Sequence, residues 1–493
     1  MKDKSQVVFP EIIPNWIDGK EVHALSGEHF SKINPANGQH LCDVTRSKES
    51  DIEKAVEIAN RTQSDWASKT PVERGDILRD IALRMNQYKE DIAHIVSKET
   101  GKSFSEATGE VGAAFELAMF MAGEGRRFYG RTTTSAIPNK FVLFNRQPVG
   151  VAGLIIAANT PIANVAWKVF PALICGNSVI LKAAEDTPAT AWFFSKLAHE
   201  TNLPSGVFNV IQGLGEEAGA PLVENSKVDL ISFTGSCKVG QYVQKTAGAR
   251  LAKVCLELGG KNPLVVCDDA DLNLAVKWAI LSAFSNAGQR CASGSRIIVF
   301  ESIYDKFRDL FLEKINLLKV GSTDDDDFGP VINETQMSNI LSVIERAKEG
   351  GASILAGGYR LQDEHLKSGF FIAPTLVEGV DSDDEISRTE LFGPVACLYK
   401  VSGFNEALEI TNSSSFGLTS AIHTKNIDRS MEFIKKSRAG VVNVNGGTYG
   451  SEPHLPFGGI KNSGTGWREP GTEALDVYSE LKVISINHDE KSI

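Results

Sequence analysis

Cysteine is sparse in this chain of 493 residues, and its placement excludes whole classes of protein. The 7 cysteines are odd in number and include no CxxC pair. A disulfide scaffold would need dense, paired cysteines, so we expect a protein of the reducing cytoplasm. The 9 histidines show no HxxH or HxxxH spacing, and we therefore expect no zinc site and no other metal site.

Long apolar runs and a surplus of basic residues are also absent. No stretch reaches the ~18 apolar residues that a membrane span needs. The first residues, "MKDKSQVVFPEIIPNW", lack the apolar core of a signal peptide. With 51 basic against 62 acidic residues, the formal net charge is −11, which disfavours nucleic acids and anionic membranes as partners.

The order of helix-like and strand-like segments predicts an α/β protein with two domains. Residues 50–125 have the apolar spacing of amphipathic helices, and we expect their charged residues on a solvated face. From residue 141 onward strands and helices alternate, which is typical of a parallel sheet covered by helices. A second alternating series begins near "KVCLELGGKNPLVVC" and runs to about residue 445.

Three segments are considered apart from this alternation of strands and helices. "FVLFNR" and "ALDVYSELKVISI" are predicted strands, which either pair with each other and with a neighbouring subunit or form ordinary sheet edges. The acidic run "TDDDD" (323–327) is predicted to be a solvated loop, because it lacks the Gly and Glu spacing of an EF-hand.

One cysteine, Cys291, lies in the stretch "SNAGQRCASGSR", among small and polar residues that would not block a substrate. A thiol becomes a strong nucleophile when its pKa falls or when a base lies close by. Arg290 would favour the thiolate if its side chain faced the sulfur. The alternative is a small buried apolar side chain, which is a common role of free cysteine.

Two further polar residues follow apolar strands. Glu257, in "VCLELGG", is costly to bury unless it has a partner or a use, and desolvation would raise its pKa toward that of a general base. The alternative is a structural glutamate in a salt bridge. Asn159, in "IIAANTP", either caps the helix that begins near Pro161 or donates its amide to a developing oxyanion.

Three segments carry weak signals for a nucleotide. "FTGSCKVG" (233–240) combines a strand, a Gly–Ser turn and a helix start, where free N–H groups suit a pyrophosphate. "ILKAAEDTP" ends a strand with Lys182 and Glu185, which either reach ribose hydroxyls or form a surface ion pair. "GLGEEAG" (213–219) is similar to a GxGxxG loop but has one residue too many.

Together these pieces resemble the aldehyde dehydrogenase family over nearly the whole chain. "INPANG", "FTGS", "LELGGKNP", "GQRC", "LFGPV" and "FGGIKNSGTGWRE" occur in the order and approximate spacing of that family. The resemblance implies that Cys291 is the nucleophile, Glu257 the general base, Asn159 an oxyanion donor together with the Cys291 N–H, and Lys168 a lysine behind the active site. The positions that match its cofactor contacts are Ile155, Lys182, Glu185, Gly215, Gly235, Ser236, Gly240, Leu258, Glu390 and Phe392.

The resemblance also implies the reaction, the oxidation of an aldehyde to a carboxylic acid with NAD. In that scheme the thiolate attacks the aldehyde, hydride passes to the nicotinamide and leaves a thioester, and Glu257 activates the water that releases the acid. A carboxylate at Glu185 favours NAD over NADP, because it would repel a 2′-phosphate. The alternatives are a CoA-acylating relative, which generally lacks the base at Glu257, and a non-enzymatic structural or binding relative.

The sequence departs from the family where the substrate would lie. Residues 157–158 are both Ala, where the family often has Pro and Trp, and Thr160 replaces a common bulky aromatic. Thr160 and Asn164 lie four apart on one helix face, so we expect a polar pocket. Arg290 and His454 are candidates for binding a carboxylate or hydroxyls at the far end of a semialdehyde; the alternative is that both face outward or are structural.

The expected architecture is a Rossmann-like cofactor domain, an α/β catalytic domain and a small β bridging element. We predict that they comprise residues 1–129 with 147–255, residues 256–450, and residues 130–146 with 451–493. A bridge shared between subunits would make the protein a homodimer or a homotetramer.

Overall fold

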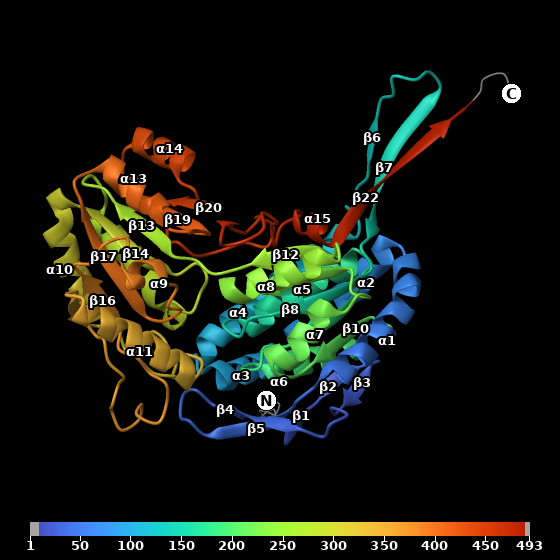
Figure 1. Ribbon diagram of the computed structural model, residues 1–493, viewed down its shortest axis with the longest axis horizontal. Helices are drawn as coiled ribbons and strands as arrows, with labels where there is room; N and C mark the ends of the chain where they lie inside the picture. Colours follow the sequence, from blue (N-terminus) through green and yellow to red (C-terminus); the bar gives the residue numbers. More distant parts are fainter. Residues whose placement is uncertain (1–8, 489–493) are drawn as a thin grey trace.

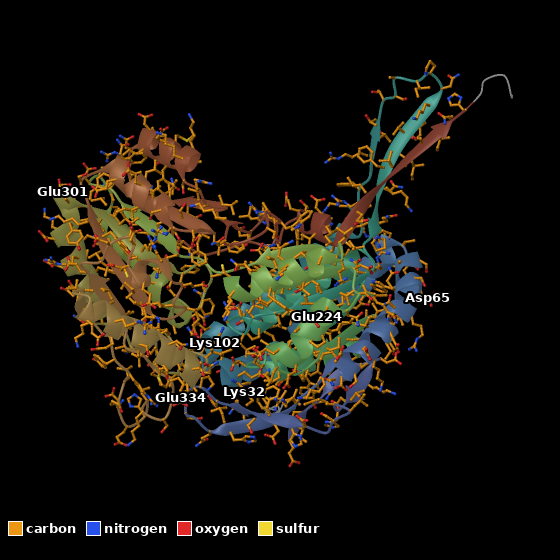
Figure 2. The ribbon with its side chains drawn as sticks, in the orientation of Figure 1. Lys32, Asp65, Lys102, Glu224, Glu301 and Glu334 are labelled. Atoms are coloured by element: carbon orange, nitrogen blue, oxygen red, sulfur yellow. The ribbon has the colours of Figure 1, made fainter. Side chains whose placement is uncertain are left out.

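The computed structural model describes residues 9–488, and it confirms the predicted α/β class. Two bodies, each built on a seven-stranded sheet, lie side by side, and a narrow arm projects from one of them (Figure 1). Lys102 and Glu334 lie where the two bodies meet (Figure 2). Residues 1–8 and 489–493 of the predicted domains lie outside the described residues.

The first body contains the sheet that the sequence predicted as the cofactor fold. Its strand order is β12-β11-β8-β9-β10-β2-β3, and the five strands from β12 to β10 are parallel. Strands β8 and β9 are buried throughout, as expected for a parallel sheet covered on both faces. The strands are β2 Asn15–Ile17, β3 Lys20–Val22, β8 Val151–Ile155, β9 Ser178–Lys182, β10 Phe208–Ile211, β11 Leu230–Thr234 and β12 Lys253–Glu257.

Helices cover this sheet on both faces (Figure 1). Several begin at capping residues; Thr70, for example, forms a reciprocal capping box with Glu73. The helices are α1 Glu49–Ser68, α2 Pro71–Gln87, α3 Lys89–Thr100, α4 Phe104–Glu124, α5 Pro161–Ile174, α6 Pro188–His199, the π-helix η1 Gly215–Gly219, α7 Ala220–Glu224 and α8 Cys237–Ala249. The predicted helical stretch 50–125 is therefore confirmed.

The second body contains the sheet β15-β16-β17-β14-β13-β19-β20, which is parallel except at β15. Its strands are β13 Asn262–Val266, β14 Gly294–Phe300, β15 Ser353–Ala356, β16 Thr375–Glu378, β17 Val395–Val401, β19 Thr419–His423 and β20 Val441–Val444. Its helices are α9 Leu272–Phe284, η2 Ser285–Gly288, η3 Glu301–Ile303, α10 Tyr304–Ile315, α11 Glu334–Glu349, α12 Glu385–Arg388, α13 Phe404–Ser413 and α14 Ile427–Lys436.

The chain crosses from the first sheet to the second in a few residues. Strand β12 ends the first sheet at Glu257, and β13 enters the second at Asn262. The two glycines of "LELGGKNP" lie in this crossing. The predicted domain limits remain a prediction, but the crossing places Glu257 at the junction of the two bodies.

The arm is a three-stranded antiparallel sheet, β6 Arg131–Thr133, β7 Lys140–Pro148 and β22 Ser479–Asn487. Strands β7 and β22 pair over nine residues, from Ser479 opposite Pro148 to Asn487 opposite Lys140. The predicted pairing of "FVLFNR" with the C-terminal strand is confirmed. The first part of "ALDVYSELKVISI" is not a strand but helix α15 (Ala474–Tyr478), whose apolar residues are buried beside α5 and override their strand preference.

Smaller sheets complete the fold: β1 Ile12–Ile13, β4 His29–Ile33 and β5 His40–Thr45 in one, β18 Phe416–Gly417 and β21 Ile460–Lys461 in the other. The acidic run is not only a solvated loop, because the Asp324 carboxylate accepts a hydrogen bond from the Ser105 N–H at 2.7 Å, near the start of α4. Within residues 9–488, no helix combines the length and apolar character needed to span a membrane.

Candidate functional site

The residues before Cys291 form a strained loop. Asn286, Ala287 and Gly288 are consecutive residues in the left-handed region, with φ of 53°, 53° and 67°. For non-glycine residues this conformation costs about 1–3 kcal/mol each and persists only where the surroundings enforce it. A Cβ at Gly288 would lie 2.1 Å from the Gly393 carbonyl oxygen, so no larger residue fits there. The loop directly before Cys291 is therefore strained and is held in place by its close contact with Gly393.

Cys291 lies at the junction of the two bodies, with an apolar wall beside its side chain. It packs in a cluster with Trp167, Ala292, Leu418, Val441, Tyr449 and Phe457. Its carbonyl accepts a hydrogen bond from the Asn262 side-chain amide at 2.7 Å. Burial, with the carboxylates of Glu390 and Glu257, raises the pKa of the Cys291 thiol to about 12. The thiol therefore needs a base, or a new positive charge nearby, before it is nucleophilic at neutral pH.

Asn159 meets the nucleophile loop directly. Its Nδ2 donates a hydrogen bond to the Gln289 carbonyl at 2.8 Å, two residues before Cys291, and its Oδ1 accepts one from Asn164 at 3.3 Å. One amide N–H then remains for another acceptor. The residue at the cap position of α5 is Thr160, so the capping role considered for Asn159 is wrong.

Glu257, at the end of β12, is buried and close to Cys291. Neither carboxylate oxygen has a hydrogen-bond partner among residues 9–488, and no ion pair within that span includes Glu257. Burial, and then the nearby Glu469 carboxylate, raise its pKa well above the usual range. The structural salt bridge considered from the sequence is therefore not formed among the described residues, and the carboxyl group has a high proton affinity.

Lys168 was predicted to lie behind the active site, and it belongs to a buried polar group near Glu257. The sequence did not identify the other members of this group. The Lys168 Nζ donates hydrogen bonds to Glu469 at 2.9 Å and to Ser232 at 2.7 Å. The Tyr478 hydroxyl donates to Glu469 as well, at 2.5 Å. The motif "FGGIKNSGTGWRE" ends on Glu469, and this was the available signal. The ion pair keeps both charges compensated inside the core.

The residues predicted for the adenosine half of a dinucleotide lie at the carboxyl ends of the parallel strands. The Lys182 ammonium is 2% exposed and pairs at 2.8 Å with Glu185, which is 47% exposed. Ser236 caps α8, with its hydroxyl accepting a hydrogen bond from the Val239 N–H at 3.4 Å. A Cβ at Gly215 would meet no atom within 4 Å, so this edge is open.

Three more predicted positions border the same edge. Ile155 ends β8, and Gly235 lies between β11 and α8. A Cβ at Gly240 would lie 2.6 Å from the Leu258 side chain, so this glycine lets α8 pack closely on the crossing. A helix N-terminus, a Lys–Glu pair and an open edge together fit an adenine dinucleotide.

The predicted nicotinamide half is built around Glu390. One of its oxygens accepts a hydrogen bond from the Gly260 N–H at 3.0 Å, and burial raises its pKa to about 7. Phe392 has φ of 52°, and the Gln336 side chain donates hydrogen bonds to the carbonyls of Leu391 at 2.5 Å and of Phe392 at 3.3 Å. Gln336 was not identified from the sequence.

The predicted substrate residues are the pair Arg290 and His454 and the pair Thr160 and Asn164. The Arg290 guanidinium lies 4.7 Å from the centre of the Tyr449 ring and donates a hydrogen bond to Ser285 at 2.5 Å. It thus contacts Tyr449 of the Cys291 cluster, and it also lies 3.9 Å from the Glu106 carboxylate of α4. The His454 side chain is 57% exposed and lies 4.0 Å from Glu452.

Thr160 and Asn164 do lie together, as the helical spacing predicted. The Asn164 amide donates to the Thr160 hydroxyl at 3.2 Å and to the Thr160 carbonyl at 3.0 Å. Because the same amide also contacts Asn159, its polar capacity is used within the protein. This geometry makes Asn164 a support for Asn159.

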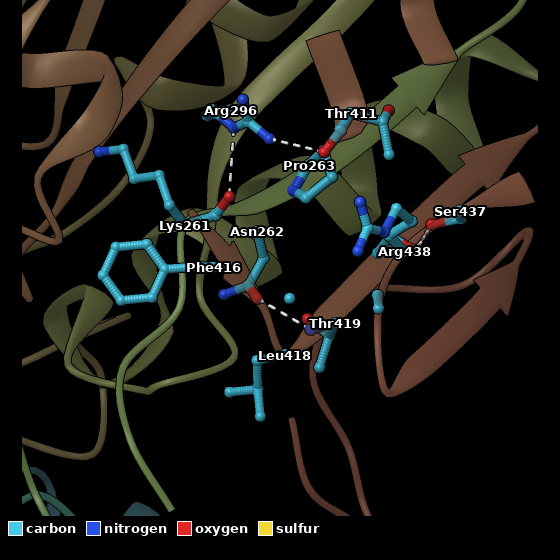
Figure 3. A pocket seen from close by; sticks show the side chains of 13 residues that line it. Lys261, Asn262, Pro263, Arg296, Thr411, Phe416, Leu418, Thr419, Ser437 and Arg438 are labelled. Atoms are coloured by element: carbon cyan, nitrogen blue, oxygen red, sulfur yellow. Dashed lines mark hydrogen bonds between the residues drawn. The ribbon is translucent and has the colours of Figure 1, made fainter. Parts of the chain in front are cut away.

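A small cavity lies in the second body, between residues 261–263 and 416–420 (Figure 3). Asn262 forms part of its wall and accepts a hydrogen bond from the Thr419 N–H at 3.0 Å. Its space for solvent is about 10 Å³, which is room for about one water molecule.

Comparison with known proteins agrees with this geometry. Residues 22–484 match the aldehyde dehydrogenase family. The chain is 38% identical over 475 residues to an alpha-ketoglutaric semialdehyde dehydrogenase of Bacillus subtilis, covering 96% of this chain and 97% of that protein. It is 36% identical to an alpha-ketoglutarate semialdehyde dehydrogenase of Haloferax volcanii, over 95% and 98% of the two chains.

Among solved structures, the betaine aldehyde dehydrogenase of Staphylococcus aureus in complex with NAD+ superposes with a TM-score of 0.94. That protein is 34% identical, and the match covers 96% of this chain and 95% of the other. The identity, the coverage and the shared fold lead to one conclusion. The chain belongs to the aldehyde dehydrogenase family, enzymes that oxidise aldehydes to carboxylic acids through a cysteine-bound intermediate.

Proposed function

We propose that this enzyme oxidises a semialdehyde, an aldehyde that also carries a carboxylate, to the dicarboxylic acid with NAD as cofactor. The observation that carries the substrate class is the Arg290 guanidinium, held over Tyr449 beside the cluster that contains Cys291. The names of the relatives from B. subtilis and H. volcanii support the same class.

Each catalytic step is assigned to a side chain of this chain. The Cys291 thiol gives its proton to solvent water, and the sulfur then forms a bond to the aldehyde carbon. The remaining N–H of Asn159 with the Cys291 N–H holds the oxyanion. When bound, a nicotinamide dinucleotide supplies the hydride acceptor. Glu257 then takes a proton from water, which attacks the thioester and releases the acid. Lys168 holds Glu469 in place behind Glu257.

Two carboxylates determine the cofactor in this proposal. Glu185 accepts hydrogen bonds from the adenosine ribose and repels a 2′-phosphate, so NAD is preferred over NADP. Glu390 accepts hydrogen bonds from the nicotinamide ribose. The Glu257 carboxyl, which has no hydrogen-bond partner among residues 9–488, also favours hydrolysis over transfer to CoA. Adding CoA to the assay tests this point, since an acyl-CoA product would contradict it.

Arg290 provides the sharpest test of the substrate class. A hydrogen-bonded ion pair to a substrate carboxylate is worth ~1.5–3 kcal/mol, so Arg290→Gln should lower kcat/KM for a carboxylated aldehyde ~10–150-fold. An uncharged aldehyde of the same length should be affected less than about threefold. Ser285→Ala serves as the control, because it removes one hydrogen bond to the guanidinium without removing its charge, and it should leave both kcat/KM values nearly unchanged. Equal losses for both aldehydes would refute the semialdehyde assignment.

We also propose that the enzyme is a cytoplasmic homo-oligomer, a dimer or a tetramer joined through the arm. The arm exposes apolar side chains that lack cover within the described chain: Phe141 50%, Ile486 50%, Leu481 59% and Val483 66% exposed. A second copy of this chain would bury them. Light scattering after size exclusion should give a dimer or tetramer for the wild type and a smaller species for the double variant Leu481→Glu, Val483→Glu. A monomeric wild type would overturn this part of the proposal.

A further inference from the structure

We propose that Lys102 and Glu110 are positioning residues that fix the direction of the Asn159 amide. The inference deepens the proposed function, since it rests on Asn159 as the oxyanion donor. Neither residue touches the sulfur. From the sequence both belonged to the charged, solvated face of the helical stretch, and this expectation is wrong, because each side chain is only 6% exposed.

The ion pair contacts both the oxyanion residue and the helix that follows it. Lys102, between α3 and α4, places Nζ 2.8 Å from the Glu110 carboxylate and 2.9 Å from the Asn159 carbonyl oxygen. The other Glu110 oxygen accepts hydrogen bonds from the N–H groups of Ile162 at 3.0 Å and Ala163 at 3.3 Å. One buried pair therefore holds the backbone on both sides of Thr160.

Helix α5 needs this support because its own sequence supplies no cap. Thr160 makes no side-chain hydrogen bond to the first turn, and Pro161 has no N–H. The free N–H groups of Ile162 and Ala163 would otherwise be buried without partners. The Glu110 side chain, which belongs to α4, therefore caps the N-terminus of α5, and the Lys102 ammonium compensates its negative charge.

The Asn159 amide is consequently fixed from two directions. Lys102 holds the main-chain carbonyl of Asn159, while the Gln289 carbonyl holds its Nδ2 at 2.8 Å. The Asn286 amide bridges the two, donating to the Asn159 and Gln289 carbonyls at 3.3 Å each. Because the main chain and the side chain of Asn159 are both held, the direction of the second N–H bond of Nδ2 is fixed. Loss of Lys102 removes the shorter of the two hydrogen bonds to the Asn159 carbonyl and leaves only the 3.3 Å bond from Asn286. The carbonyl end is then held less firmly, and that N–H can turn.

The nucleophile loop is anchored on the same helix. Glu106, one turn before Glu110 on α4, accepts a hydrogen bond from the Asn286 N–H at 3.2 Å. Residues four apart share a helix face, so one face of α4 holds both the start of α5 and the strained loop. This helix sets the distance between the oxyanion donor and the thiol.

The test is a double-mutant cycle between Lys102→Met and Asn159→Ala, with kcat, KM and the pre-steady-state rate of NADH formation as readouts. Loss of one oxyanion donor typically costs 10²–10³ in kcat. Lys102→Met should lose a part of this, about tenfold or more in kcat, with KM for NAD unchanged within about twofold. In the Asn159→Ala background it should lose nothing more, since interacting sites are non-additive. Lys102→Arg should restore most of the rate.

Lys98→Met is the matched control, an exposed lysine four residues earlier on α3, and it should leave every parameter unchanged. If Lys102→Met does not fold, Glu110→Gln takes its place in the cycle, because it keeps an acceptor for the Ile162 and Ala163 N–H groups and loses only the charge. Additive losses, with Lys102→Met costing as much with or without the Asn159 amide, would overturn the positioning role. Full kcat in Asn159→Ala alone would overturn the proposed function instead.

Discussion

Glu390 is expected to make NAD binding depend on pH near neutrality. Its carboxyl accepts a hydrogen bond from the Gly260 N–H, and burial raises its pKa to about 7. The ionised form offers acceptors to both hydroxyls of a ribose, whereas the protonated form has one acceptor fewer and adds a donor. Affinity should therefore rise with pH as the carboxyl ionises.

The size of the effect follows from that pKa. With a pKa of about 7, roughly 10% of the enzyme carries the ionised carboxylate at pH 6 and roughly 90% at pH 8. If only the ionised form binds well, the apparent Kd for NAD should be ~10-fold larger at pH 6 than at pH 8. Binding itself should draw the proton off, so a pH-indicator dye should record proton release near pH 6.5.

Quenching of tryptophan fluorescence on titration with NAD, from pH 6 to pH 8.5, measures this dependence. Glu390→Gln should bind more weakly and show no pH dependence over the same range. Glu385→Gln is the control, because Glu385 is exposed and paired with Arg346, and it should keep the wild-type profile. A Kd that is flat with pH in the wild type, or equally steep in Glu390→Gln, would refute the reasoning.

The same carboxyl should affect stability with a defined sign. Its folded-state pKa of about 7 exceeds the ordinary value of 4.5, so its contribution is greatest below pH 4.5 and is lost as pH rises to about 7. The loss is at most about 3 kcal/mol. Glu390→Gln should thus gain stability relative to the wild type between pH 5 and pH 8, measured by urea unfolding at each pH. A difference in unfolding free energy between Glu390→Gln and the wild type that stays constant with pH would contradict this prediction.

Three further outcomes are expected. Because the Cys291 thiol has a pKa of about 12, the rate of its alkylation by iodoacetamide should rise about tenfold per pH unit from pH 7 to 10. Peptide mass spectrometry measures this rate, and a plateau below pH 9 would contradict the prediction. Gly259→Ala places a Cβ 1.8 Å from the Glu390 carboxylate and should mainly raise KM for NAD. Gly260→Ala places a Cβ 2.3 Å from the Cys291 carbonyl oxygen and should mainly lower kcat. The reverse assignment of the two effects would contradict both predictions. Glu185→Ser should raise kcat/KM for NADP relative to NAD at least about tenfold, and an unchanged ratio would show that Glu185 does not contact the ribose.

Local pattern was sufficient for the main architecture. Buried parallel strands have continuous apolar sequences, so the two alternating series and their order could be predicted without coordinates. The pairing of β7 with β22 was one of two alternatives that the sequence left open for these strand-like segments, and the structure decides in its favour. The helix α15 could not be predicted, since its apolar residues also suit a strand and only packing beside α5 decides between the two.

Local sequence was likewise informative for one part of the candidate site and misleading for another. A distinctive local segment identified each of three residues, Cys291, Glu257 and Asn159, and the structure brings these segments to one junction. Lys102 and Glu110 were misassigned because a charged residue in an amphipathic helix is usually solvated. Their burial comes from the start of α5 packing on α4, which is a long-range contact with no local sequence signature.

Trapping of the covalent intermediate tests the central claim most directly. Glu257→Gln removes the base for hydrolysis and leaves the thiol and the Asn159 amide in place. With NAD and a semialdehyde, the account predicts one rapid equivalent of NADH per subunit and an acyl adduct on the peptide that contains Cys291. Continued turnover without a stable adduct, or an adduct on another of the seven cysteines, would contradict it.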